Sequence, residues 1–272
     1  MGATRRGERQ PGKSDQIDAL AVARAVLREG VERFPAAFLD EQAMEIRLLS
    51  DHRDHLVAER TRAQNRLRWH LLDLCPQLEA SLPARSLDRT VHLDRVLRVL
   101  RRSPADARAR IARHLVTHIR QLTREIKTLE VQLRGLIERH RPQLLDELGC
   151  GPLTAATLIG RTAGAERFAT DSQFARQAGA APIPASSGRR DRHRLHRGGD
   201  RQLNRALHMI AITRAARDAD TRDYLDRKMA EGKTRKEAIR CLKRHLARRF
   251  HRLLAEAPTT TINNRVSPPG LT

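Results

Sequence analysis

The chain has 272 residues and carries 53 Lys and Arg against 32 Asp and Glu, a formal net charge of +21. An excess this large repels itself, and phosphate backbones are its commonest partner because bound Lys and Arg release condensed counterions. Aromatic residues, at 3%, are too few for a large β-sandwich, whereas abundant Ala and Leu favour helices. No apolar run reaches about 18 residues, so we expect no membrane span. Three scattered cysteines are typical of a reducing cytoplasm.

The first predicted helix begins near Asp15, after 14 basic, glycine-containing residues that we expect to be disordered. Ser14 or Asp15 caps this helix and Gly30 ends it. Asp15 and Asp18, three residues apart, lie on one helix face. Such a pair can hold Mg²⁺ beside phosphates. N-terminal capping with compensation of the helix dipole is the alternative, and the pattern by itself favours that alternative.

Two long helices are predicted over residues 40–74 and 106–139, separated by a segment that contains Pro83 and Pro104. The second helix has the most regular apolar spacing in the chain, in alternating steps of four and three residues. These heptad residues are Leu115, Ile119, Leu122, Ile126, Leu129, Leu133 and Leu136. The spacing predicts either an antiparallel coiled-coil arm made by the two helices or a seam between two chains, and it does not distinguish them.

A glycine-containing turn follows Pro142, where Gly149 and Gly151 flank Cys150 between two predicted short helices. Glycines let the backbone turn tightly and approach a ligand, and the N–H groups that open the next helix suit a phosphate. This is the pattern of a helix-hairpin-helix, which grips the DNA backbone without reading sequence. An ordinary helix–helix turn is the alternative; the basic context favours binding.

Residues 187–205 form the first of two strongly basic segments, with seven Arg and two His against two Asp. That density exceeds what solubility requires, so we expect contacts with nucleic acid. The arginines concerned include Arg189, Arg190, Arg192, Arg194, Arg197 and Arg201. Ser187 opens the segment, and a serine hydroxyl can attack phosphorus where arginines stabilise the developing charge. The pattern alone favours an ordinary loop serine.

The second basic segment, residues 233–252, has nine Lys and Arg and one acid. Its apolar residues form one helical stripe, which places the basic side chains on the opposite face. We therefore predict a phosphate-facing helix, with Lys243, Arg244 and Arg248 among the DNA contacts. A membrane-surface helix is the less favoured alternative.

Taken in order, these segments resemble the DEDD-type insertion-sequence transposases, the serine-containing recombinases guided by a bridge RNA. The resemblance covers roughly residues 11–255, and its motifs are too long for chance to explain them easily. They are GKSDQIDALAVARA, RTRAQNRLRWHLLDLCPQL, ELGCGPLTAATLIG, FARQAGAAPIPASSG, HRLHRGGDRQLNRALHMIAITRA and EGKTRKEAIRCLKRHLARRFHRLL.

The resemblance implies a mainly α chain in four parts: the remaining helix of an RNase H-like α/β catalytic domain in 1–35, a coiled-coil arm in 36–141, a transposase domain with the helix-hairpin-helix in 142–256, and a disordered tail in 257–272. It implies Ser187 as the nucleophile, with Ser186 as the less favoured neighbour, and Asp15 and Asp18 as acids that bind Mg²⁺. DNA, a guide RNA and a second copy joined through the coiled coil are the implied partners.

The family pattern also has a strand bearing a first Asp and a strand-rich stretch bearing a Glu, and neither has a counterpart in the 14 residues before Asp15. Two of the four acids are therefore missing from this sequence. The alternative to an active transposase and recombinase is accordingly a non-catalytic remnant that still binds nucleic acid.

Overall fold

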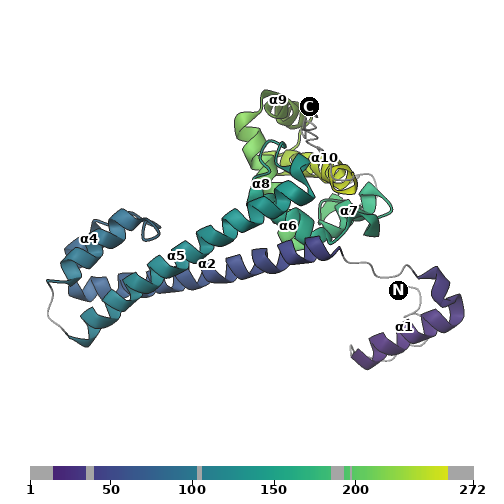
Figure 1. The fold of residues 1–272 in the computed structure, drawn as a ribbon. Coiled ribbons are helices and arrows are strands. Elements are labelled where there is room, and N and C mark those ends of the chain that lie inside the picture. The colour runs from purple at the N-terminus through teal and green to yellow at the C-terminus, as the bar shows by residue number, and fades with distance from the viewer. Residues whose placement is uncertain (1–14, 35–39, 103–105, 185–192, 197, 257–272) are drawn as a thin grey trace, which may run out of the picture. The chain divides into compact units, whose positions relative to one another are not determined.

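The computed structural model describes residues 15–34, 40–102, 106–184, 193–196 and 198–256, with 184 and 193–195 described by their backbone alone. The predicted mainly α class is confirmed (Figure 1). The chain divides into two compact units, 1–38 and 39–272, and each is described by itself. Among the described residues, no helix combines the length and the apolar character that a membrane crossing requires. The tail expected to be disordered, 257–272, and the first 14 residues lie outside the described part.

In the first unit, helix α1 spans Asp15–Glu29 and the 3-10 turn η2 spans Val31–Arg33. The predicted start and end of this helix are confirmed, because Gly30 adopts φ +79 and stops it. None of the α1 side chains is buried, and Leu27 is 87% exposed.

The second unit begins with an arm of four helices: α2 (Glu41–Leu74), α3 (Pro76–Ala80), α4 (Thr90–Leu100) and α5 (Ala107–His140). Asp40 and Asp106 cap the two long helices by accepting hydrogen bonds from backbone N–H groups in the first turn. Helices α2 and α5 lie side by side (Figure 1) and run antiparallel, since Gln42 bonds His140 near one end and Arg60 bonds Thr123 farther along.

The heptad residues of α5 face α2 of the same chain. Five of the seven are buried, and Leu129 and Leu136 are half-buried. Leu56, Ala63 and Leu67 are buried on the facing side of α2. Of the two alternatives, the heptad residues therefore form an antiparallel arm between two helices of the same chain.

A separate apolar core closes the far end of the arm, where α3 and α4 fold back onto α2 and α5. Its buried residues lie between positions 63 and 119 and include Leu71, Leu93, Val96 and Val116. Helix α4 was not predicted, because the prolines on either side of it indicated breaks in the pattern. Residues 90–100 nonetheless have apolar side chains at helical spacing, and Leu93, Val96 and Leu100 are buried.

The remaining elements form a compact helical body: η3 (Pro142–Leu144), α6 (Pro152–Thr162), η4 (Ala165–Arg167), α7 (Asp171–Gln177), β1 (Pro182–Pro184), β2 (His193–Leu195), α8 (Arg201–Arg217), α9 (Ala219–Ala230) and α10 (Arg235–Ala255). The helix predicted over residues 233–252 is confirmed as α10. Their apolar faces meet around Phe174 and Phe250, which are fully buried.

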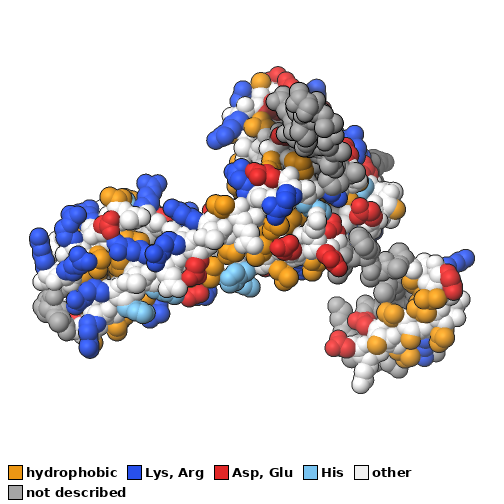
Figure 2. Space-filling model, in the orientation of Figure 1, with side chains coloured by type: hydrophobic (Ala, Val, Ile, Leu, Met, Phe, Trp, Pro, Cys, Tyr) orange, Lys and Arg blue, Asp and Glu red, His pale blue; other side chains and the backbone are white. Residues whose placement is uncertain are grey.

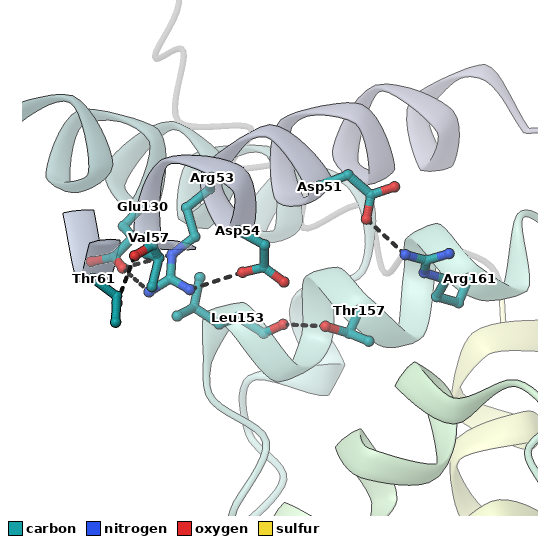
Figure 3. A network of polar contacts seen from close by, with 9 residues as sticks. All are labelled: Asp51, Arg53, Asp54, Val57, Thr61, Glu130, Leu153, Thr157 and Arg161. Carbon is teal, nitrogen blue, oxygen red and sulfur yellow. Dashed lines mark hydrogen bonds and ion pairs between the residues drawn. The ribbon is translucent and has the colours of Figure 1, made fainter. Parts of the chain in front are cut away.

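The arm is fixed to the body where α2 crosses α6. A side chain at Gly160 would come within 2.8 Å of Arg47, so only glycine allows this approach. Polar contacts surround the crossing (Figure 3): Arg161 donates to Asp51 at 2.7 Å, and Arg53 joins Glu130 at 2.6 Å. These bonds hold α2 to α6 on one side and to α5 on the other.

Candidate nucleic-acid interface

The glycine turn around Cys150 has a helix after it, as predicted, but no α-helix directly before it. Helix α6 begins at Pro152 as expected, but the segment before the turn contains only the 3-10 turn η3. The predicted short helix there is wrong, because only one 3-10 turn forms before the glycines. Pro142 disfavours helical backbone at Arg141, whose φ is −150 and ψ 64, and this separates η3 from α5. The helix-hairpin-helix itself stays a prediction.

The two glycines of this turn have different surroundings. Gly149 adopts φ +87, and a Cβ there would lie 3.1 Å from the carbonyl oxygen of Ile210 and from the Cβ of Thr213. Gly149 therefore packs against α8. Gly151 is exposed at the N-cap of α6, and a Cβ added to it would meet no atom within 4 Å. Of the two glycines, Gly151 is the one with enough free space beside its backbone for a phosphate to approach.

Glu147 ties this turn to two distant helices, a role that the sequence pattern did not indicate. Its carboxylate accepts from Arg214 of α8 at 2.5 Å and from both Nε and Nη2 of Arg249 of α10, at 2.7 and 2.6 Å. Burial would raise the pKa of Glu147, but the hydrogen bonds and charges of Arg249 and Arg214 outweigh it and hold that pKa below its ordinary value. Both arginines are thus engaged within the fold.

In the sequence, the segment that carries Ser187 lies between two short strands. Strands β1 and β2 pair antiparallel, with Pro184 opposite His193. Ser187, Arg189, Arg190 and Arg192, and also Arg197, lie outside the described residues, and Arg194 is described by its backbone in β2 alone.

The base of that hairpin is held tightly to α7 and α8. A side chain at Gly199 would overlap the backbone of Gly179, and the N–H of Asp200 donates to the carbonyl of Gln177 at 2.6 Å. The Asn204 amide donates to the carbonyls of Ala178 and Gly179 at 2.9 and 3.0 Å. Asp200 caps α8 by accepting from two N–H groups at its start.

Lys243 reinforces this base from α10, and its predicted position on the exposed basic face is wrong. The side chain is 6% exposed, and its amine donates to the Asn204 side chain at 2.5 Å. Lys243 falls in helical phase with Ile239, Leu246 and Phe250, so it shares their buried stripe. Burial, with a smaller contribution from the Arg240 charge, lowers the pKa of Lys243 to about 8.

The other predicted cations of the body are nearer to solvent. Arg201 at the start of α8 and Arg244 on α10 are exposed. Arg248 is half-buried and forms an ion pair with Asp171 at 3.2 Å. Of these three, Arg201 and Arg244 are the ones that a nucleic acid could reach without breaking an ion pair.

Asp15 and Asp18 both lie in the first turn of α1 and are exposed. Within the described part of the chain, no three His, Cys, Asp or Glu side chains come close enough to hold a metal ion together. The structure thus places these two carboxylates on one helix turn and in a different compact unit from the turn and the hairpin.

Comparison with known proteins defines the class to which this helical body belongs. Residues 143–226 match the model described as the Transposase IS116/IS110/IS902 family, and residues 1–76 match a DEDD transposase model of the IS110 group. A 43.6 kDa protein of insertion element IS110 from Streptomyces coelicolor is 31% identical over 276 residues, covering 84% of this chain and 67% of that protein. A 42 kDa protein of insertion element IS900 from Mycobacterium paratuberculosis is 28% identical, covering 88% and 70%.

These matches run from the first residues through the turn, the hairpin and α8. The chain therefore belongs to the IS116/IS110/IS902 family of insertion-element transposases. Membership of a transposase family implies an interaction with DNA.

Proposed function

We propose that this chain is a transposase that binds DNA through the exposed arginines of its helical body and cleaves it with Ser187. The family match over residues 143–226, which includes Ser187, carries the proposal. Arg201 and Arg244 support the binding part, since both are exposed and arginine binds phosphate oxygens through two parallel hydrogen bonds.

In the proposed step, the Ser187 hydroxyl oxygen forms a bond to the phosphorus of a DNA phosphodiester. The bond from phosphorus to one deoxyribose oxygen breaks, that oxygen leaves as a hydroxyl, and the serine proton is given up. The product is a phosphoserine link, so the energy of the broken ester is retained. Attack by a hydroxyl of another strand then releases the serine and joins the two strands.

The covalent link gives the sharpest test. Incubation with a labelled duplex carrying the insertion-element ends, followed by denaturing electrophoresis, is expected to show a protein–DNA adduct. Ser187→Ala abolishes the adduct, whereas the matched control Ser186→Ala retains it. An adduct that survives in Ser187→Ala, or is lost only in Ser186→Ala, contradicts the assignment.

Mg²⁺ is the cofactor that the family resemblance implies, and Asp15 and Asp18 would be two of its ligands. Mg²⁺ requires octahedral oxygen coordination and usually keeps several waters. The described residues supply these two carboxylates, but no three His, Cys, Asp or Glu side chains among them could hold a metal ion together, so they fit a complete site only in part. The step proposed above therefore runs through Ser187 alone. If Asp15→Asn and Asp18→Asn leave adduct formation unchanged, neither carboxylate takes part.

A protein that binds DNA without cleaving it is the alternative. The incomplete set of metal-binding side chains among the described residues favours it. Steeply salt-dependent DNA binding with no adduct in the wild-type chain would establish this alternative. A guide RNA and self-association rest on the resemblance alone; co-purified RNA and the mass in solution would test them.

A further inference from the structure

The charge of the arm is concentrated at one end. The distal arm, defined as residues 60–124, contains 15 Arg, no Lys and five Asp and Glu. The proximal arm, residues 40–59 and 125–141, contains six Lys and Arg against nine Asp and Glu. Figure 2 shows Lys and Arg side chains gathered over the end of the arm that carries α4. The arm is therefore polarised, with its positive end away from the body.

The acids of the distal arm are almost all occupied. Asp73 pairs with Arg108, Glu79 with Arg68 and Asp94 with Arg120. Asp106 caps α5. All three of these arginines are half-buried, so these pairs leave the exposed arginines of the distal arm without compensation.

Ten arginines of the distal arm are exposed, and among the described residues none of them lies in an ion pair with a carboxylate. They are Arg62, Arg66, Arg85, Arg89, Arg95, Arg98, Arg101, Arg102, Arg110 and Arg124. So many unpaired cations on one small core repel one another and destabilise the free protein. A polyanion that binds there removes this repulsion and gains from counterion release.

Four of these arginines lie on helices that pack on the distal core. Arg62 and Arg66 are one turn apart on α2, and Arg95 and Arg98 share a face of α4. Trp69, the only tryptophan in the chain, follows on the same face of α2 as Arg66. It is 58% exposed, and the Arg108 guanidinium lies 5.3 Å from its ring centre.

We propose that the distal arm is a second DNA-binding surface, which contacts the phosphates of the same duplex that the body binds. This inference rests on the proposed function. Arg47, which touches α6, and Arg66 are separated along α2 by roughly 30 Å at 1.5 Å per residue. One turn of B-DNA is about 34 Å long. A duplex of about 20 base pairs, roughly two turns, is therefore long enough to reach from the distal arm past the crossing of α2 with α6 at the body.

Trp69 reports occupancy of this surface directly, because selective excitation of tryptophan isolates its emission. Titration of the full chain with a duplex of about 30 base pairs is expected to change that emission, with a midpoint that shifts with salt. The distal triple variant R62Q/R66Q/R95Q loses at least about tenfold in affinity at about 0.1 M salt, and the slope of log affinity against log salt falls by about 3.

The matched control removes three cations from the proximal arm. Lys127, Arg134 and Arg139 are exposed there, and K127Q/R134Q/R139Q is expected to bind within about twofold of wild type, because acids outnumber bases in the proximal arm and Arg134 already pairs with Glu138. Equal losses in both triples, or an unchanged affinity and Trp69 emission in the distal experiment, overturn the proposal.

Two further comparisons distinguish DNA from RNA as the ligand of the distal arm, and distinguish the arm proposal from the proposal that Ser187 is the nucleophile. A response of Trp69 to duplex RNA with none to duplex DNA overturns the choice of DNA. A distal triple with weakened DNA binding, together with adducts that Ser187→Ala does not abolish, supports the arm surface and contradicts the proposed nucleophile. If Ser187→Ala abolishes the adducts while the distal triple variant binds DNA as wild type does, Ser187 is supported as the nucleophile and the arm surface is contradicted.

Discussion

The distal arm and helix α10 are both rich in arginine, but they use it differently. On α10, Lys243 is buried against Asn204, Arg249 is held by Glu147, and Arg248 is paired with Asp171. On the distal arm, ten exposed arginines have no ion-pair partner among the described residues. Some cations of a basic segment can therefore be structural while others, such as Arg244 on α10, stay exposed. The capacity of such a segment for phosphate depends on how many of its cations the fold itself already engages.

The largest expected effect tests the structural half of this comparison. Glu147→Gln removes the charge that two arginines share and leaves Arg214, which is only 18% exposed, without its counterion. Because breaking a buried pair is costly, we expect unfolding in urea to show a loss of about 3 kcal/mol. The matched change on the arm, Glu79→Gln, breaks a more exposed pair with Arg68 and should cost about 1 kcal/mol or less. Equal losses of unfolding free energy in the two variants would contradict the view that the Glu147 pairs are structural in a way that the arm pairs are not.

A second prediction concerns the buried amine of α10. The folded pKa of Lys243 is about 8, below its ordinary value of 10.5, so the unfolded chain binds more protons between these two pH values. The free energy of unfolding should therefore rise from pH 8 to 10.5, by up to about 3 kcal/mol from this residue. Lys243→Met should lack this rise when the two proteins are compared pH by pH. Parallel curves would show that Lys243 is hydrated in solution.

The glycine turn offers a smaller and paired test. Gly149→Ala places a methyl group at φ +87 and against α8, so we expect a loss of about 2 kcal/mol in urea unfolding. Gly151→Ala has open space and an ordinary φ of −74, and should cost less, about 1 kcal/mol or below, because Ala is only a poorer N-cap than Gly. Gly151→Ala should instead weaken DNA binding if a phosphate approaches there. Tolerance of Ala at both positions would contradict the packing of Gly149.

The smallest effect is a chemical one. Burial, together with the nearby Glu147 charge, raises the pKa of the Cys150 thiol to about 12. Since the thiolate is the reactive form, Cys150 should be the slowest of the three cysteines to react with a thiol reagent at about pH 8. Cys75 and Cys241 are half-buried and should be modified first. Mass spectrometry of partly modified protein measures the order, and early modification of Cys150 would contradict its burial.

Local signals predicted much of the fold. Helices α2, α5 and α10 each have a capping residue and an apolar stripe, so their bounds could be predicted within a few residues. Helix α4 was missed because Pro83 and Pro104 masked a short apolar repeat. The helix predicted before Gly149 was wrong, because only the 3-10 turn Pro142–Leu144 forms between the end of α5 at His140 and the glycine turn.

The site was harder to predict, because it depends on contacts between distant segments. Nothing in the sequence joins Glu147 to Arg249, about a hundred positions away, or Asn204 to Lys243. Helical phase alone would have placed Lys243 on the buried stripe. The net charge of the distal arm could have been counted from the sequence. Only the structure shows that Asp73, Glu79 and Asp94 each pair with a half-buried arginine and so leave the exposed arginines without an acidic partner.

The two apolar cores of the second unit differ in how far apart their residues lie in the chain. The distal core draws on residues 63–119, whereas the core of the body joins Ala43 and Ile46 to Leu254. A core built from nearby residues has a smaller loop-closure entropy and forms sooner. During synthesis the end of the arm can therefore fold while α10 is still unmade, and the body must wait for its last helix. In pulsed hydrogen exchange during refolding, the amides of α4 should become protected before those of α6.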